Sequence, residues 1–178
     1  MSPDELKNLI RTVPDFPQPG VQFRDITTLI GHGRGLRASV EHLANRARQT
    51  GADAIAGMEA RGFIFGAAVA AHMGIGFVPI RKPGKLPVAT LAVDYELEYG
   101  TDRLEVDSSG IGEGQNVVMV DDLIATGGTA LAAAQLLKQA GARLDHALFV
   151  IDLPDLGGAK KLRDAGLQVQ SLMEFDGD

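Results

Sequence analysis

The sequence predicts an α/β protein with a central, mostly parallel sheet flanked by helices. One observation is that apolar runs of strand length alternate along the chain with segments of helical spacing. A second is the run from Val117 to Ala130, V-V-M-V-D-D-L-I-A-T-G-G-T-A, which indicates a buried strand ending at two carboxylates, then a small-residue loop and a helix. Such a loop offers free backbone N–H groups and a positive helix end to a phosphate. The 178 residues suit one domain.

The N-terminal part combines a short helix, an irregular stretch and a longer helix. Ser2-Pro3-Asp4-Glu5 is a capping box with proline in the first turn, and we expect the helix that it opens to end near Thr12. Prolines in 16–20 disfavour regular structure there. Apolar residues at helical spacing over 36–47 predict an amphipathic helix, which Gly51 closes.

The remaining chain alternates between strand and helix. We expect strands over 54–56, 77–80, 117–120, 144–151 and 169–172, and helices over 63–73, 130–138 and around 160–162. The stretch from Leu86 to Ser109 interrupts this order, and its own alternation predicts an excursion of two β-strands. Strands that alternate with helices imply parallel pairing through right-handed crossovers.

Composition excludes several functional classes. Asp and Glu outnumber Lys and Arg by 23 to 17, whereas a nucleic-acid surface would show a basic excess. The chain has no cysteine, so it contains neither disulfides nor thiolate metal sites. Its start lacks a signal-peptide pattern, and no apolar run approaches the roughly 20 residues that span a bilayer. We therefore expect a soluble cytoplasmic protein.

The acid pair beside the small-residue loop limits the kinds of ligand that can bind there. Asp121 and Asp122 repel a bare phosphate, but carboxylates accept hydrogen bonds from hydroxyls or bind a divalent cation. A sugar phosphate, with or without a metal ion, meets these requirements. Neither the P-loop motif nor the dinucleotide-binding G-x-G-x-x-G motif accompanies this strand.

Three polar segments follow predicted strands, namely Glu59–Gly62, Arg81–Lys85 and Asp121–Thr129. Ligands of parallel α/β sheets bind beyond the carboxyl ends of the strands, so these segments would meet at one cleft if their strands are neighbours. The basic segment Arg81–Lys85 is by itself compatible with a solvated turn. Next to a phosphate loop in an acidic protein, a second phosphate site is favoured, and the ligand then carries phosphate at each end of a sugar.

The run from Val117 resembles the phosphoribosyl-diphosphate signature of the type I phosphoribosyltransferases. Three further segments, in the same order along the chain, are similar to the adenine phosphoribosyltransferase family: F-P-Q-P-G-V-Q-F-R-D-I-T at 16–27, R-K-P-G-K-L-P at 81–87 and Y-E-L-E-Y-G at 95–100. Gly62–Gly66 also matches, and the resemblance extends from about Leu6 to Leu172.

The resemblance implies a Mg²⁺-dependent pentosyltransferase of purine salvage, which converts adenine and 5-phosphoribosyl 1-diphosphate to AMP and pyrophosphate. It implies the type I fold, with a hood at about 1–34, a core at about 35–178 and a mobile loop at about 86–105. The metal would be bound mainly through the diphosphate substrate, with no protein ligand of its own. The family resemblance also favours a homodimer, and no nucleic-acid or membrane partner.

Site residues are assigned by the same resemblance. Glu98 would exchange a proton with the purine, and Arg61 and Lys82 would neutralise the departing pyrophosphate. Asp121 and Asp122 would hold the ribose hydroxyls. The remaining substrate contacts would come from Val21, Phe23, Arg24, Glu59, Ala60, Arg81, Lys85, Tyr99, Ala125, Thr126, Gly127, Gly128 and Thr129.

Two alternatives belong to other functional classes. Some proteins of this fold are regulators that sense phosphoribosyl diphosphate and bind DNA, but they need a basic face and an added module, and this chain is acidic. A sugar-phosphate binder without catalysis is the other, and product formation separates it from the enzyme. If the protein used a different base, such as xanthine or uracil, the family assignment would stand and the substrate assignment would change.

Overall fold

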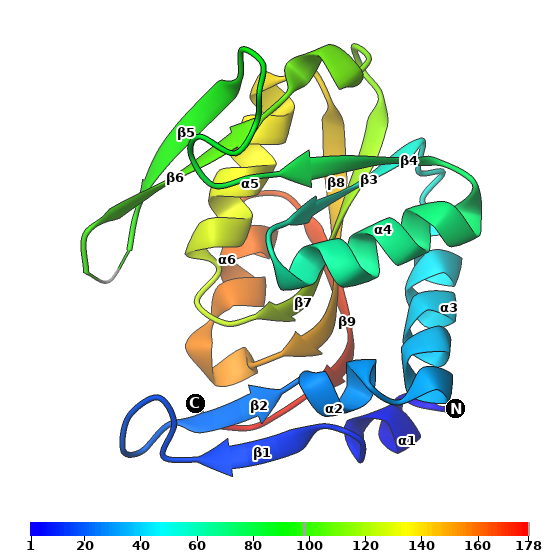
Figure 1. Cartoon of the computed structure of the whole chain (residues 1–178), viewed down its shortest axis with the longest axis vertical. Helices are drawn as coiled ribbons and strands as arrows, with labels where there is room; N and C mark the ends of the chain where they lie inside the picture. The colour runs from blue at the N-terminus through cyan, green and yellow to red at the C-terminus, as the bar shows by residue number, and fades with distance from the viewer. Residues whose placement is uncertain (98, 178) are drawn as a thin grey trace.

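A computed structural model describes residues 1–97 and 99–177 and has a five-stranded parallel sheet at its centre (Figure 1). Its strand order is β4-β3-β7-β8-β9. The strands are β3 (Ala54–Met58), β4 (Gly76–Ile80), β7 (Asn116–Ile124), β8 (Arg143–Asp152) and β9 (Gln168–Glu174). This confirms the predicted α/β class with a central parallel sheet.

Helices cover both faces of the sheet, which explains why its strands are apolar without alternation. Helices α3 (Gly33–Gln49) and α4 (Arg61–Met73) pack on one face, where Val118 and Val120 are fully buried. Helices α5 (Gly128–Gln139) and α6 (Gly158–Asp164) pack on the other, against Val117 and Met119. Short 3₁₀ turns at Ser108–Gly110 and Pro154–Leu156 complete the connections. In the described residues, no helix has both the length and the apolar character that crossing a membrane requires.

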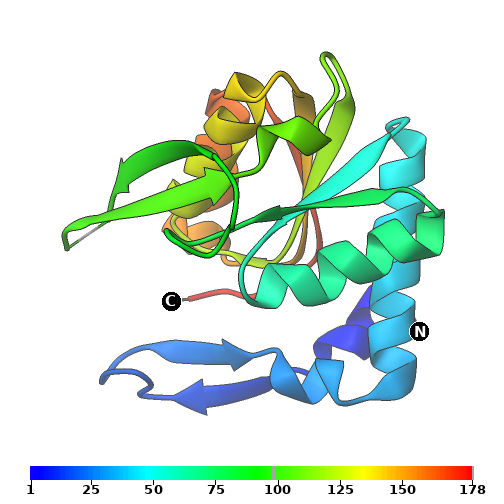
Figure 2. The ribbon, with the colours of Figure 1, turned by 45° about the horizontal axis from the view of Figure 1, so that its top comes forward.

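The N-terminal segment forms a separate layer that we call the hood. It contains α1 (Pro3–Lys7), the antiparallel strands β1 (Arg11–Pro14) and β2 (Gln22–Asp25), and α2 (Thr27–Ile30). The capping box at Ser2 is present, but the expectation of a helix to Thr12 was wrong, because Arg11–Pro14 pairs with the strand that follows the proline-rich turn. The tail after β9 runs between hood and core (Figure 2), where the Asp176 carbonyl accepts a hydrogen bond of 2.9 Å from Arg24.

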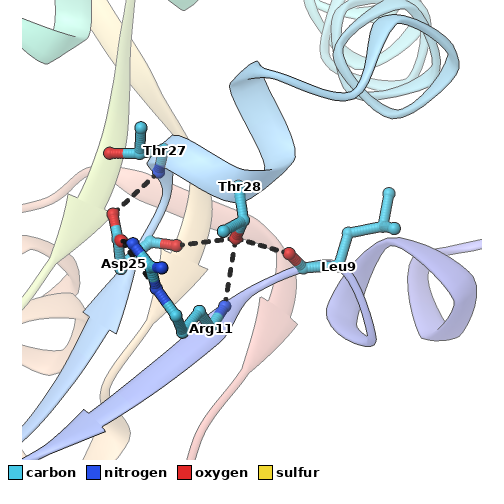
Figure 3. Close-up of polar contacts among 5 residues, drawn as sticks. All are labelled: Leu9, Arg11, Asp25, Thr27 and Thr28. Carbon is cyan, nitrogen blue, oxygen red and sulfur yellow. Dashed lines mark hydrogen bonds and ion pairs between the residues drawn. The ribbon is translucent and has the colours of Figure 1, made fainter.

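Polar contacts fix the corner between β1, β2 and α2 (Figure 3). Arg11 forms an ion pair with Asp25, which also accepts a 2.9 Å hydrogen bond from the Thr27 amide. The Thr28 hydroxyl donates to the carbonyl of Leu9 at 2.6 Å. Hydrogen bonds from Thr27 and Arg11 lower the pKa of Asp25 to about 2, so the carboxylate stays ionised and the corner is held at neutral pH.

The predicted two-stranded excursion is present as the antiparallel hairpin β5 (Leu91–Glu96) and β6 (Thr101–Val106). Leu104 and Val106 are buried in the cluster that contains α5, and Val93 and Tyr95 pack against it. This hairpin and the hood hairpin extend toward the side that the carboxyl ends of β3, β4 and β7 face, on the left in Figure 1. The two hairpins therefore flank the sheet edge at which ligands of such folds bind.

Candidate active site

A cavity of about 440 Å³ lies at the carboxyl ends of β3 and β7. It brings together residues from all three segments that the sequence placed after predicted strands. Its walls are Met58, Glu59, Ala60, Arg61, Gly62, Lys82 and residues 121–130. Val21, Phe23, Arg24, Arg81, Lys85 and Tyr99, which were also predicted for the site, are not among the residues that line it.

The loop between β7 and α5 has the geometry of an anion site. Strand β7 continues to Ile124, four residues further than the predicted end at 120, since Leu123 and Ile124 still pair with β8. Gly127 then adopts φ +81°, and α5 begins at Gly128 without a side-chain cap. The first backbone N–H groups of a helix have no intrahelical acceptor, so they are available to a ligand in the cavity.

Two glycines let this loop pack against the start of α6. The Gly158 amide donates to the carbonyl of Ala125 at 2.9 Å. A Cβ atom at Gly127 would lie 2.8 Å from the Gly158 Cα, and a Cβ at Gly158 would lie 2.3 Å from the Ala125 oxygen. Gly127 needs glycine for its left-handed φ as well. Gly158 was not singled out from the sequence, because its neighbour in space lies about thirty residues earlier in the chain.

The acid pair occupies the cavity wall between the loop and the turn after β3. Asp122 is buried and its Oδ2 accepts a hydrogen bond of 2.5 Å from Nε of Arg61. Oδ1 of Asp121 accepts from the Asp122 amide at 2.8 Å. Burial, and then the charge of Asp122, raise the pKa of Asp121 well above its ordinary value. The repulsion of an anion is therefore reduced, because one carboxylate has a cationic partner and the other resists ionisation.

Gly62 allows Asp121 to approach the start of α4. A Cβ at this position would lie 2.7 Å from the Asp121 Oδ1 atom. Glycine at 62 therefore leaves room for the carboxyl group at the first turn of α4, where the helix dipole is positive.

Glu59 forms hydrogen bonds with the basic segment Arg81–Lys85 next to the cavity. Its carboxylate accepts from the Lys82 amide and from Nε of Arg81, the latter at 3.2 Å, and the Glu59–Ala60 peptide bond is cis. Burial raises the pKa of Glu59, but these hydrogen bonds and the charges of Arg81 and Lys85 outweigh it, so the pKa lies below its ordinary value. The carboxylate thus holds the basic turn close to the cavity.

Lys82 has partners that the sequence did not reveal. Its ammonium forms an ion pair with Asp102 and lies 3.5 Å from the hydroxyl oxygen of Tyr95. Tyr95 and Asp102 face each other across the β5–β6 hairpin. The sequence predicted the two strands of the excursion, but only the hairpin register makes Tyr95 and Asp102 neighbours.

The residues predicted to bind the base lie in the hood and at the excursion tip. The Phe23 ring packs edge-to-face on Phe16, with centroids 5.1 Å apart. The Arg24 guanidinium stacks on the Phe175 ring and donates to the Thr12 hydroxyl, so its side chain joins hood and tail. Tyr99 is 88% exposed. Glu98, the predicted proton-exchanging residue, lies outside the described residues.

The acid pair is the place at which the chain itself could ligate a metal ion. Among residues 1–97 and 99–177, no three His, Asp or Glu side chains are grouped closely enough to hold an ion. Asp122, the more buried member of the acid pair, is already bound to Arg61.

A parallel sheet whose central strand leads through a small-residue loop into a helix, with a cationic turn lining the same cavity, is typical of α/β proteins that bind phosphorylated ligands. Residues 28–165 match the family described as the phosphoribosyl transferase domain. A curated adenine phosphoribosyltransferase from Novosphingobium aromaticivorans is 70% identical over 177 residues, which cover 99% of both chains. The chain belongs to the adenine phosphoribosyltransferase family.

Solved structures agree with this placement. The adenine phosphoribosyltransferase of Thermoanaerobacter pseudethanolicus superposes with a TM-score of 0.92 at 48% identity, covering 98% of this chain and 100% of the other. The enzyme from Saccharomyces cerevisiae, in complex with an imino-altritol bisphosphate and adenine, has a TM-score of 0.89 at 38% identity, covering 96% and 98%. The similarity thus includes the hood and the excursion as well as the sheet.

Proposed function

We propose that the protein converts adenine and 5-phosphoribosyl 1-diphosphate to AMP and pyrophosphate. The observation that carries this proposal is the cavity at the ends of β3 and β7. Its lining combines the small-residue loop before α5, the cations Arg61 and Lys82, and the acid pair. A ribose with phosphate groups at C5′ and C1′ carries the groups that this lining can bind.

The 5-phosphate would bind the loop Ala125–Thr129. Backbone N–H groups at the start of α5 and the hydroxyls of Thr126 and Thr129 are suitable donors. Asp121 and Asp122 would accept hydrogen bonds from the ribose hydroxyls. Their position also favours positive charge at C1′, which develops when the bond to the diphosphate lengthens.

The diphosphate would bind on the opposite side. Arg61 and Lys82 line the cavity, and Arg81 and Lys85 lie in the adjoining turn, which contacts Glu59. Backbone groups of the Glu59–Ala60 turn would contribute to this contact. Mg²⁺ would arrive with the diphosphate as part of the substrate complex, as the family resemblance implies, and the phosphate oxygens would supply most of its ligands.

The base would enter beneath the hood. Val21 and Phe23 would stack on the adenine ring, with backbone groups near Arg24 reading its edge. N9 of adenine would form a bond to C1′ while the bond from C1′ to the diphosphate oxygen breaks, and its electron pair leaves with pyrophosphate. The proton that N9 loses would pass to Glu98 next to Tyr99, a role taken from the family resemblance.

Relatives support the choice of substrates. The yeast structure holds adenine together with a bisphosphate whose two phosphates flank a sugar-like ring. A relative from Trypanosoma brucei, 25% identical with a TM-score of 0.83, was solved with AMP, pyrophosphate and ribose 5-phosphate. A homodimer and a cytoplasmic location remain predictions from the resemblance and composition.

The decisive experiment mixes the purified protein with adenine, phosphoribosyl diphosphate and Mg²⁺ and follows AMP by chromatography. Hypoxanthine, xanthine and uracil in place of adenine serve as controls. We expect AMP from adenine and little product from the other bases. Consumption of another base without AMP would refute the substrate, and binding of the diphosphate without any product would indicate a binding protein instead.

A further inference from the structure

The β5–β6 hairpin connects the two phosphate sides of the cavity. On the diphosphate side, Arg81 and Glu105 exchange backbone hydrogen bonds of 2.9 and 2.8 Å, which join β6 to the basic turn. On the other side, β5 packs along α5, and a Cβ at Gly128 would lie 3.9 Å from the carbonyl oxygen of Glu96. The hairpin therefore contacts both the turn that carries Lys82 and the loop that begins α5.

A polar network crosses the base of this hairpin. The Tyr95 hydroxyl donates to Oδ2 of Asp102 at 3.1 Å. The same oxygen of Asp102 pairs with the Lys82 ammonium. The Thr129 hydroxyl donates to the Tyr95 oxygen at 3.3 Å. One hydroxyl group thus lies between a side chain of the phosphate loop and the cation of the basic turn.

The number of hydrogen bonds that each group can donate and accept agrees with this network. A tyrosine hydroxyl has one proton to donate and two lone pairs, which match Asp102 as acceptor and Lys82 and Thr129 as donors. An ammonium group has three N–H bonds, and Asp102 and Tyr95 take two of them. Within residues 1–97 and 99–177 no other side chain accepts the third, so a phosphate does not need to break the ion pair in order to bind Lys82.

Two of the four side chains in this network line the cavity and two do not. Lys82 and Thr129 line the cavity, whereas Tyr95 and Asp102 are not among its lining residues. All four side chains are partly buried. Because a lysine side chain loses conformational entropy when it is fixed, a carboxylate that fixes it beforehand strengthens later phosphate binding.

We propose that Tyr95 and Asp102 are positioning residues that hold Lys82 ready for the diphosphate and couple it to Thr129 in the phosphate loop. This assignment rests on the proposed function, because the positions of the 5-phosphate and the diphosphate in the cavity come from the proposed reaction. The opposite hypothesis is that Asp102 competes with the diphosphate for Lys82, and it predicts tighter binding when Asp102 is neutralised.

The test measures binding of pyrophosphate and of AMP, separately and with Mg²⁺ present, by titration calorimetry. Asp102→Asn should weaken pyrophosphate about tenfold and AMP less than about twofold, because only the diphosphate side uses Lys82. Tyr95→Phe should weaken both ligands about threefold, because the hydroxyl serves both sides. Asp94→Asn is the matched control, since Asp94 is exposed and pairs with Arg103 on the same hairpin.

A double-mutant cycle distinguishes an effect of Asp102 that acts through Lys82 from a general disturbance of the structure. In a Lys82→Met background, the further change Asp102→Asn should leave pyrophosphate affinity within about twofold, because the residue that Asp102 positions is absent. Unchanged or tighter pyrophosphate binding by the Asp102→Asn variant overturns the proposal. So does an equal loss of AMP and pyrophosphate affinity in that variant.

Tyr95→Phe provides an independent test if Asp102→Asn fails to fold, and affinities equal to those of the unsubstituted protein would overturn the coupling. AMP formation by the unsubstituted protein is measured in parallel. A protein that forms no AMP but shows the expected split between the two ligands would refute the proposed reaction and retain the positioning role.

Discussion

Nε of Arg61 lies 2.5 Å from Oδ2 of Asp122, so the acid pair of β7 has a cation supplied by the first residue of α4. The Asp122 side chain is only 7% exposed, whereas that of Arg61 is 56% exposed. The buried carboxylate is therefore compensated, and the guanidinium still faces the cavity. An anionic ligand can approach the acid pair because its charge is partly neutralised in advance.

Asp122→Asn should lower kcat/KM for phosphoribosyl diphosphate by about 100-fold. The substitution keeps the shape of the side chain but removes the charge that holds Arg61 and, in the proposed complex, would face the ribose. Steady-state kinetics of AMP formation measure the effect. The control is Asp145→Asn, which breaks a surface ion pair with Arg143 and should leave kcat/KM unchanged. Equal activity of the two variants would refute the role of Asp122.

Asp121→Asn should stabilise the protein while reducing its activity. Burial, then the charge of Asp122, raise the pKa of Asp121 above its ordinary value of 3.8, so ionisation of this group opposes folding. The penalty is absent at low pH and grows as the pH rises through the folded-state pKa. The Tm of the variant should exceed that of the unsubstituted protein by about 2–6 °C at neutral pH, and the difference should shrink toward about pH 4.

Calorimetric or fluorescence melts across this pH range measure the difference. Asp145→Asn again serves as the control, because its carboxylate lies on the surface in an exposed ion pair. A variant at Asp121 that melts below the unsubstituted protein at every pH would show that the carboxylate contributes more through hydrogen bonds than its burial removes.

The parts of the site that sequence could predict are those formed by one continuous segment. The loop Ala125–Thr129 follows its strand directly, and its small residues and the helix start after it already predict an anion site. The pair of Arg61 with Asp122 depends instead on β3 and β7 being neighbours in the sheet. Apolar strands predict a parallel sheet without fixing the order of its strands, so the cation for the acid pair was not identified beforehand.

The hood shows a second limit. The capping box at Ser2 was predictable because it is a local pattern. The sequence predicted a helix that ends near Thr12. Residues 11–14 instead form β1, because their hydrogen-bonding partners lie in 22–25, beyond a proline-rich turn. Cross-strand pairing between segments of a few residues leaves little periodicity in the sequence.

Asp25→Asn should loosen the hood in a pH-dependent way. Hydrogen bonds from Thr27 and Arg11 lower the pKa of this carboxyl to about 2, so it stabilises the folded state above its unfolded value of 3.8 and loses this effect as the pH falls. The variant should melt about 2–5 °C below the unsubstituted protein at neutral pH. The gap should close between about pH 4 and pH 2.

Thermal melts of both proteins over this range test the prediction, with Asp164→Asn as control because Asp164 forms an exposed pair with Lys160 within α6. A constant gap down to low pH would show that the effect of the substitution does not come from the charge of Asp25.

Gly127→Ala should abolish AMP formation while the sheet stays folded. A methyl group there would lie 2.8 Å from the Gly158 Cα, and the left-handed φ of +81° adds backbone strain. The loop must therefore move from the start of α6, which displaces the N–H groups that would bind the 5-phosphate. The control is Gly114→Ala, at φ +71° with no atom within 4 Å, which carries the same strain without the clash. We expect the control to lose about 1 kcal/mol of stability and keep its affinity for AMP. Isothermal titration with AMP distinguishes the variants, and full AMP affinity in Gly127→Ala would refute the assignment of this loop to the 5-phosphate.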